Sequence, residues 1–257
     1  MIMIISESKI RKIVRNLLKE ELSDPTIRAA QAGLALCHFV SNSFLRNQTH
    51  VCLYDPQIIL QGITSNDLKK DLVIRDSLKA VVELGQPDFY GKNGANPITI
   101  SVAKPNSKMG PAAYECSLWI AQKQKFEKTK KDKQGFAKSP PGGVTPDRES
   151  VSDSAQSVWK KYSLRNDVES YRLDDIDDPV TPHEWDDSSL HKNHDYLNKS
   201  YVLKKEPAKF KELVNNHEKF FRTLHQMNTT TSQWYENNLT LYFERESASM
   251  FNQYYLD

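Results

Sequence analysis

The sequence predicts a mixed α/β fold of the α+β kind, with a central sheet flanked by helices. Three observations carry this prediction. Residues 98–102 alternate apolar and small polar side chains, as a strand does. A turn of small residues follows and opens a helix at about Pro111. A continuous apolar face runs along 210–224 at helical spacing.

Composition bounds the class of protein. The 257 residues suffice for one well-buried domain with attachments. A hydrophobic fraction of 38% and a mean hydropathy of −0.65 indicate that part of the chain is exposed. The net charge of +2 makes nucleic acid an unexpected partner. No stretch approaches the roughly 20 apolar residues of a membrane span.

The first two elements are predicted to be helices. After Ser6 or Ser8, apolar residues recur at helical spacing between basic side chains. This helix is either a docking segment or an ordinary helix with a solvated basic face. Asp24-Pro25 predicts the start of a second helix through about Phe44. Together they form an expected N-terminal helical extension over 1–48.

Strands are predicted from His50 onward. Short apolar runs at 51–54, 58–60 and 80–82 are interrupted by turn residues, which is typical of strands or buried edges. Ile98–Val102 is the clearest strand in the chain. The helix beginning near Pro111 should run through Ala121.

The second half is predicted to alternate order with loops. Six lysines between Lys123 and Lys133, followed by Pro140-Pro141-Gly142-Gly143, predict a mobile loop over 123–141. A helix follows through Tyr162. The central domain is expected to end near residue 205, and 206–257 should form a helix and an aromatic tail.

The turn Lys108-Met109-Gly110-Pro111-Ala112-Ala113 is the main candidate binding motif. Small residues that open a helix leave first-turn N–H groups unpaired, and such donors can hold a pyrophosphate. This arrangement resembles the acetyl-CoA motif of GNAT acetyltransferases over roughly residues 50–205. The resemblance implies acetyl-CoA as cofactor, held by this turn and by the strand that ends at Val102. Lys108 stands where the first glycine of the family motif is expected.

Ala155 to Trp159 resembles the next GNAT motif, in which many members place a general-acid tyrosine. Here that position holds Trp159, and Tyr162 follows one turn later. The resemblance makes Tyr162 the candidate catalytic residue. The alternative is that Tyr162 is a packed aromatic.

A second resemblance is to GNAT-like proteins of tailed phages. It rests on the Gly110–Glu115 turn, the segment Gly142–Ser152 and Val158–Tyr162. It implies a viral origin and residence in the host cytoplasm or the virion. Leu18-Lys19-Glu20 also resembles the sites that some phage prohead proteases cut.

Other constellations are weaker. His191 and His194, with His183 nearby, do not fix a closed ligand set, so no metal site is predicted. The odd number of cysteines in apolar surroundings favours free buried thiols and a reducing compartment.

The sequence and its resemblances predict two alternative functions. The chain is expected to be a phage-associated GNAT-like protein, and an acetyl-CoA-dependent N-acyltransferase if it is active. The alternative is a non-catalytic virion structural or host-interaction protein that keeps the fold. It would meet a protein partner through the N-terminal helix or the aromatic tail. The acyl acceptor and the oligomeric state stay open.

Overall fold

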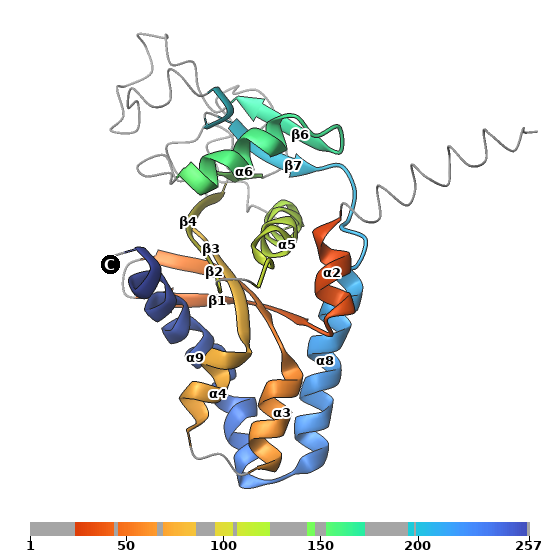
Figure 1. Ribbon diagram of the computed structural model, residues 1–257, viewed down its shortest axis with the longest axis vertical. Helices are drawn as coiled ribbons and strands as arrows, with labels where there is room; N and C mark the ends of the chain where they lie inside the picture. The colour runs from red at the N-terminus through yellow and green to blue at the C-terminus, as the bar shows by residue number, and fades with distance from the viewer. Residues whose placement is uncertain are drawn as a thin grey trace, which may run out of the picture.

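A computed structural model describes residues 24–43, 46–65, 69–85, 96–104, 107–123, 143–146, 153–172, 195–197 and 199–255. Seven strands form one sheet in the order β1-β2-β3-β4-β5-β7-β6 (Figure 1). The strands are β1 (Ala35–Ser43), β2 (Arg46–Tyr54), β3 (Leu78–Leu84), β4 (Asn96–Ala103), β5 (Val144–Thr145), β6 (Val168–Arg172) and β7 (Lys199–Leu203). The prediction of a mixed α/β fold is confirmed.

Helices occur between and after the strands. They are α2 (Pro25–Gln31), α3 (Pro56–Thr64), α4 (Lys70–Ser77), α5 (Gly110–Lys123), α6 (Asp153–Ser163), α8 (Phe210–Met227) and α9 (Thr230–Tyr255), with a 3-10 turn η2 at Asp195–Leu197. Among the described residues, no helix is both long and apolar enough to cross a membrane.

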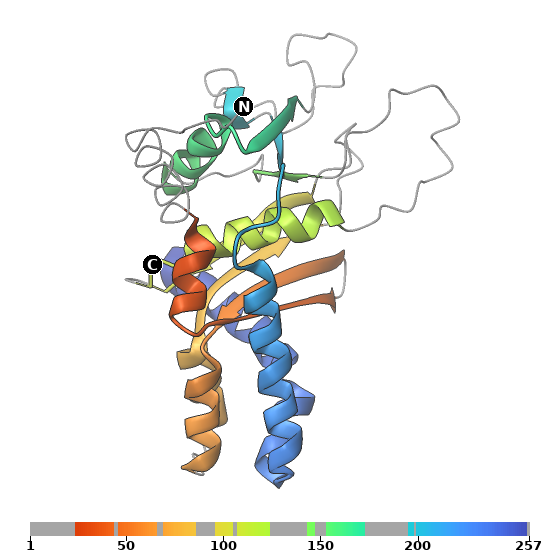
Figure 2. The same cartoon turned by 90° about the vertical axis from the view of Figure 1, so that its right-hand side faces the viewer.

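The sheet changes character at β4. Strands β1 to β4 are antiparallel neighbours with long registers. Strand β5 then runs parallel to β4, and β7 and β6 complete the sheet with antiparallel pairing. The β6–β7 pair and α6 lie at the opposite end of the molecule from α3 and α8 (Figures 1 and 2).

The two faces of β1–β4 are covered by different helices. Helices α2 and α5 cover one face, where Leu36, Val51, Val82 and Ala113 belong to one apolar cluster. Helices α3, α4, α8 and α9 contribute to a second cluster with Cys37, Tyr54 and Val81. The strand residues alternate between the two clusters because successive side chains point to opposite faces.

Helix α2 is much shorter than the sequence predicted. Asp24 caps it by accepting a hydrogen bond from the Thr26 N–H at 2.8 Å, as expected. Gly33 then adopts a φ of 70°, and the Leu34 N–H bonds back to Ala29 O at 3.1 Å. This glycine ends the helix, so the prediction of a helix through Phe44 was wrong. Residues Ala35–Ser43 form the edge strand β1 instead.

The run 58–60 is helical and not a strand. Asp55 caps α3 through the Gln57 N–H at 3.0 Å, and Pro56 occupies its first turn. Gly62 allows close packing on α4, since a Cβ there would lie 2.8 Å from Val73 Cγ1. The other predicted strands, near 51–54, 80–82 and 98–102, are confirmed as parts of β2, β3 and β4.

The C-terminal part is an antiparallel pair of helices. The predicted helix with an apolar face is confirmed as α8, and Asn228 ends it with a φ of 46°. The aromatic tail is helical as α9. Its Tyr235, Leu239 and Phe243 are fully buried at helical spacing.

The division into 1–48, 49–205 and 206–257 stays a prediction. The structure does place β1, from the first part, and α8, from the last, against the sheet of the middle part. The expected N-terminal basic helix lies outside the described residues. So do nearly all of the 123–141 loop and the histidines at 183, 191 and 194.

Candidate functional site

The turn between β4 and α5 has an unusual backbone. Lys108 adopts a φ of 56°, a region that glycine occupies readily and lysine seldom does. The turn is tied to β3, because Lys104 N–H and Ser107 Oγ both donate to Lys79 O, at 3.0 and 3.3 Å. The surrounding hydrogen bonds therefore hold Lys108 in a left-handed conformation at the predicted cofactor turn.

The first turn of α5 offers fewer donors than the sequence suggested. The Met109 N–H donates to Ser107 Oγ at 3.3 Å, and the Ala113 N–H donates to Met109 O at 3.1 Å. Pro111 has no N–H. Within the described part of the chain, the N–H groups of Gly110 and Ala112 have no hydrogen-bond partner. These two amides and the exposed Lys108 side chain are what the turn can present to an anion.

An open strand edge lies next to this turn. Strand β4 pairs with β5 only at Asn96↔Val144 and Pro97↔Thr145. Its other edge pairs with β3 from Ile98 to Ala103. Among the described residues, the stretch 98–103 therefore has no strand on the β5 side. It includes Val102, whose backbone belongs to β4.

Tyr162 is buried, and its hydroxyl is already engaged. It lies on α6, is 4% exposed, and donates to Glu115 Oε1 at 3.0 Å. Burial and the neighbouring Glu115 carboxylate raise the pKa of Tyr162 well above its usual value. Glu115 follows Gly110 by five residues on α5, which is about 7.5 Å along the helix axis. The predicted turn therefore lies at the start of α5, whereas Tyr162 contacts α5 more than one helical turn further along.

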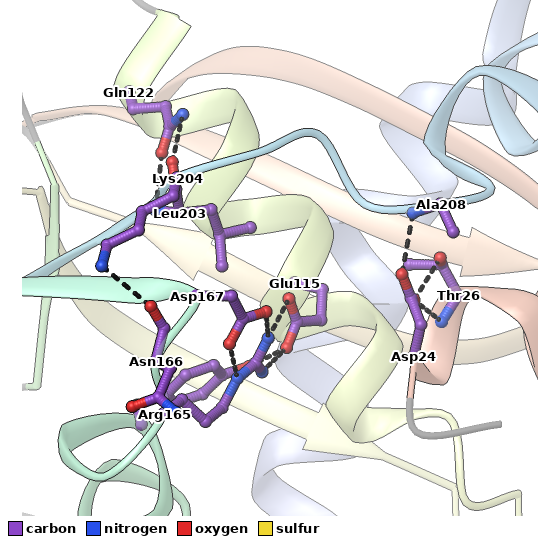
Figure 3. Close-up of polar contacts among 11 residues, drawn as sticks. Asp24, Thr26, Glu115, Gln122, Arg165, Asn166, Asp167, Leu203, Lys204 and Ala208 are labelled. Atoms are coloured by element: carbon purple, nitrogen blue, oxygen red, sulfur yellow. Dashed lines mark hydrogen bonds and ion pairs between the residues drawn. The ribbon is translucent and has the colours of Figure 1, made fainter. Parts of the chain in front are cut away.

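Tyr162 belongs to a charged cluster that the sequence did not indicate. Arg165 contacts the buried carboxylate of Glu115 and also binds Asp167, from Nε at 2.9 Å and from Nη2 at 2.6 Å (Figure 3). The guanidinium lies 5.1 Å from the Tyr162 ring centre. The cluster joins α5 to the end of α6 and the start of β6.

The groups of this cluster shift one another's pKa values. Burial raises the pKa of Glu115, and the contacts with Arg165 and Tyr162 offset only part of that shift. The hydrogen bonds from Arg165 lower the pKa of Asp167. The cluster can hold a proton between Tyr162 and Glu115, and the Tyr162 hydroxyl and the Glu115 carboxylate are both already engaged within it.

Trp159, at the position of the family tyrosine, is a core residue. It is 1% exposed and stacks on Tyr201 of β7, with ring centres 5.2 Å apart. Its ring also meets the edge of Tyr114 on α5. Trp159 therefore packs α6 between α5 and β7.

Two further side chains that could carry chemistry are Cys116, which is buried, and His217, which is half-buried. Burial raises the pKa of the Cys116 thiol, which disfavours the reactive thiolate. His217 lies against Tyr54, with Nδ1 2.8 Å from the tyrosine hydroxyl. Within the described ranges, no three His, Cys, Asp or Glu residues are grouped to hold a metal ion.

Comparison of the chain with family models, curated proteins and solved structures found no match.

Proposed function

We propose that this chain is a phage-associated, GNAT-like protein that binds acetyl-CoA and acts as an N-acyltransferase. The observation that carries the proposal is the open edge of β4 beside the α5 turn. A pantetheine arm carries amide groups that can pair with free strand N–H and C=O groups, as an added strand does. Residues 98–102, where this pairing is expected, have no strand partner on the β5 side within the described chain.

The backbone of Lys108 gives a second, independent support. The family motif has glycine at this position, and Lys108 keeps the left-handed φ that glycine favours. Backbone strain of this kind costs about 1–3 kcal/mol and is common at ligand-binding sites. The lysine also adds a flexible positive charge where the pyrophosphate would lie. The amides of Gly110 and Ala112 would supply the directed hydrogen bonds.

The chemistry proposed is direct attack. The acceptor amine adds to the thioester carbonyl, and the tetrahedral intermediate collapses with loss of the coenzyme A thiolate. Rate enhancement would come mainly from positioning of the two reactants. Tyr162 could protonate the thiolate only after its hydroxyl left Glu115, so its proposed part as a general acid requires that this hydrogen bond break.

A second candidate is a non-catalytic protein of the virion or one that binds a host factor. The observation in its favour is the cluster of Tyr162, Glu115 and Arg165, which ties elements together as a structural network does. A protein partner would then meet the N-terminal segment or α9. In both cases we propose the host cytoplasm or the virion as the location.

Calorimetric titration with acetyl-CoA separates the two candidates. Gly110→Val should abolish binding, because the side chain displaces the phosphates from hydrogen bonds of about 1.5–3 kcal/mol each. Lys108→Ala should weaken binding less, since the amides remain. Lys123→Ala, at the other end of α5, is the matched control and should bind as the wild type does.

The folding of each variant is checked by thermal unfolding. If the wild type does not bind acetyl-CoA at millimolar concentration, the acyltransferase proposal fails and the structural candidate stands. Equal binding by Gly110→Val and the wild type would show that acetyl-CoA binds somewhere other than this turn.

A further inference from the structure

A serine, a histidine and a glutamate lie in a row across three neighbouring strands. His50 of β2 is directly opposite Glu83 of β3 in the register, and Ser41 of β1 lies diagonal to it. Ser41 Oγ is 2.8 Å from His50 Nε2, and His50 Nδ1 is 3.4 Å from Glu83 Oε1. The imidazole thus stands between a hydroxyl and a carboxylate.

This row lies on the face of the sheet that α5 does not cover. His50 precedes Val51, which packs in the α5 cluster, so its side chain points to the other face. On that face Phe39, between Cys37 and Ser41 in β1, packs against the second apolar cluster. The row is therefore separate from the proposed acetyl-CoA turn and from the Tyr162 cluster.

Stability alone gives a poor account of the buried His50 ring. Ser41, His50 and Glu83 are 6%, 2% and 4% exposed, and burying polar groups costs free energy unless they are hydrogen-bonded. His50 Nδ1 is buried and makes no hydrogen bond within the described chain, and its contact with Glu83 Oε1 at 3.4 Å is an ion pair. A buried polar atom left in this way calls for an explanation, and a catalytic role is one of those known in proteins.

The charges around His50 favour one tautomer. A proton on Nδ1 would lie beside the Glu83 carboxylate, with Nδ1 and Oε1 3.4 Å apart, and would leave the Nε2 lone pair for the Ser41 hydroxyl. The opposite tautomer would set a lone pair against the carboxylate. Phe39 stacks on the imidazole at 4.9 Å with an interplanar angle of 5°, which fixes the ring plane. This is the arrangement in which a histidine accepts a serine proton.

We propose that Ser41 is the nucleophile of a second acyl-transfer site, with His50 as its general base and Glu83 as the residue that orients His50. The substrate class is an activated ester or thioester. Ser41 Oγ bonds to the carbonyl carbon while its proton passes to His50 Nε2. The bond to the leaving alcohol or thiol then breaks as His50 returns the proton to it. Water then attacks the carbonyl carbon of the acyl-serine while its proton passes to His50 Nε2. The bond to Ser41 Oγ breaks as His50 returns that proton to the serine, which frees the acid.

The position of Ser41 at the sheet edge suits this role. Strand β1 is the outermost strand, and α8 bonds to the chain just before it, through Asn216 Nδ2 and Leu34 O at 2.8 Å. Ser41 lies toward the other end of β1, two residues before the end of the strand at Ser43.

A fluorophosphonate probe tests the site on the full-length protein. We expect intact mass to show one adduct and peptide mapping to place it on Ser41. Ser41→Ala should lose the adduct. His50→Gln should label about 10²–10⁴-fold more slowly, since that is the contribution of a positioned general base. Glu83→Gln should label more slowly than the wild type and faster than His50→Gln.

Ser77→Ala is the matched control. Ser77 is equally buried, but its hydroxyl donates to a backbone carbonyl, Ile74 O, at 2.7 Å, so this variant should label as the wild type does. The proposal is overturned if the folded wild type gains no adduct on Ser41, or if His50→Gln labels Ser41 at the wild-type rate. Should His50→Gln fail to fold, the wild-type adduct and its mapped position decide.

Discussion

The two halves of the sheet are held together in different ways. Strands β1 to β4 have 7 to 9 residues each, pair along most of that length and are packed by helices on both faces. Strands β5, β6 and β7 have 2, 5 and 5 residues. These short strands make few backbone hydrogen bonds, and side-chain contacts add to them, chiefly those of Glu115, Gln122 and Arg165. The comparison indicates that long ladders and apolar burial stabilise the first half, whereas the second half combines apolar burial around Trp159 and Tyr201 with a few polar contacts.

Phe243→Ala should have the largest effect and would test the apolar half. Phe243 is fully buried, with its ring centre 5.0 Å from that of Tyr54. Removing a buried phenyl group should lower the free energy of unfolding by about 3–5 kcal/mol. Leu241→Ala, on the same helix but 51% exposed, should change it by less than about 0.5 kcal/mol. Urea unfolding of both variants measures the difference.

Arg165→Ala tests the polar half. Losing one partner of a fully buried ion pair costs about 3–5 kcal/mol, and we expect about 2 here because Arg165 is partly exposed. The variant leaves Glu115 buried with the Tyr162 hydroxyl.

The loss in Arg165→Ala should depend on pH. Burial already raises the folded-state pKa of Glu115 above the ordinary 4.5, and without Arg165 it should rise further. The folded state then keeps a proton that the unfolded state has lost. Stability should therefore recover as the pH falls through the raised folded pKa toward 4.5. A loss that is the same at pH 5 and pH 7 would show that Glu115 is not the group left uncompensated.

Gly143→Ala probes the junction of the two halves. A Cβ at Gly143 would lie 2.7 Å from Tyr201 O and 3.1 Å from Val202 Cγ2, so β5 and β7 would have to separate. We expect a loss of about 1–3 kcal/mol, as for other overpacked sites. Gly110→Ala is the control, since among the described residues its Cβ would come near Ala103 Cβ alone, at an ordinary contact distance of 3.4 Å. Equal melting temperatures for the two variants would contradict the close β5–β7 approach.

Lys108→Gly should have the smallest effect, and it should be stabilising. Relief of the left-handed conformation gains about 1–2 kcal/mol. The greater freedom of glycine in the unfolded chain removes about 0.5–1 kcal/mol of that gain. Asn228→Gly should gain less, because asparagine tolerates a φ of 46° better than lysine tolerates 56°. Thermal unfolding compares them, and a destabilised Lys108→Gly would mean that the lysine side chain itself stabilises the turn.

Local signals predicted part of this fold and misled in two places. Asp-Pro starts a helix at both Pro25 and Pro56, but the apolar residues 58–60 gave the second site the appearance of a strand. Gly33 was the available stop signal for α2, and the alanine-rich run 29–32 outweighed it. Short apolar runs do not separate strand from helix by periodicity alone.

The candidate sites show a different limit of prediction from sequence, which is the distance in the chain between the residues that form them. The turn at Lys108–Ala113 could be found because its residues are consecutive in the sequence. Glu115 and Arg165 are fifty positions apart, and Ser41, His50 and Glu83 come from three strands. Only the strand register and the crossing of α5 bring these groups together. No local pattern carries that information.

Gln122 shows how a side chain can take the place of a strand. Its amide accepts from the Leu203 N–H at 2.9 Å and donates to Leu203 O at 3.1 Å, the two bonds that a neighbouring peptide unit would make (Figure 3). Strand β5 ends at Thr145 and does not pair with Leu203 among the described residues, and Leu203 is only 4% exposed. Without Gln122 the Leu203 N–H and C=O would be buried with no partner on this side, which costs free energy. Gln122 thus lets the sheet end next to a helix without leaving buried backbone groups unpaired.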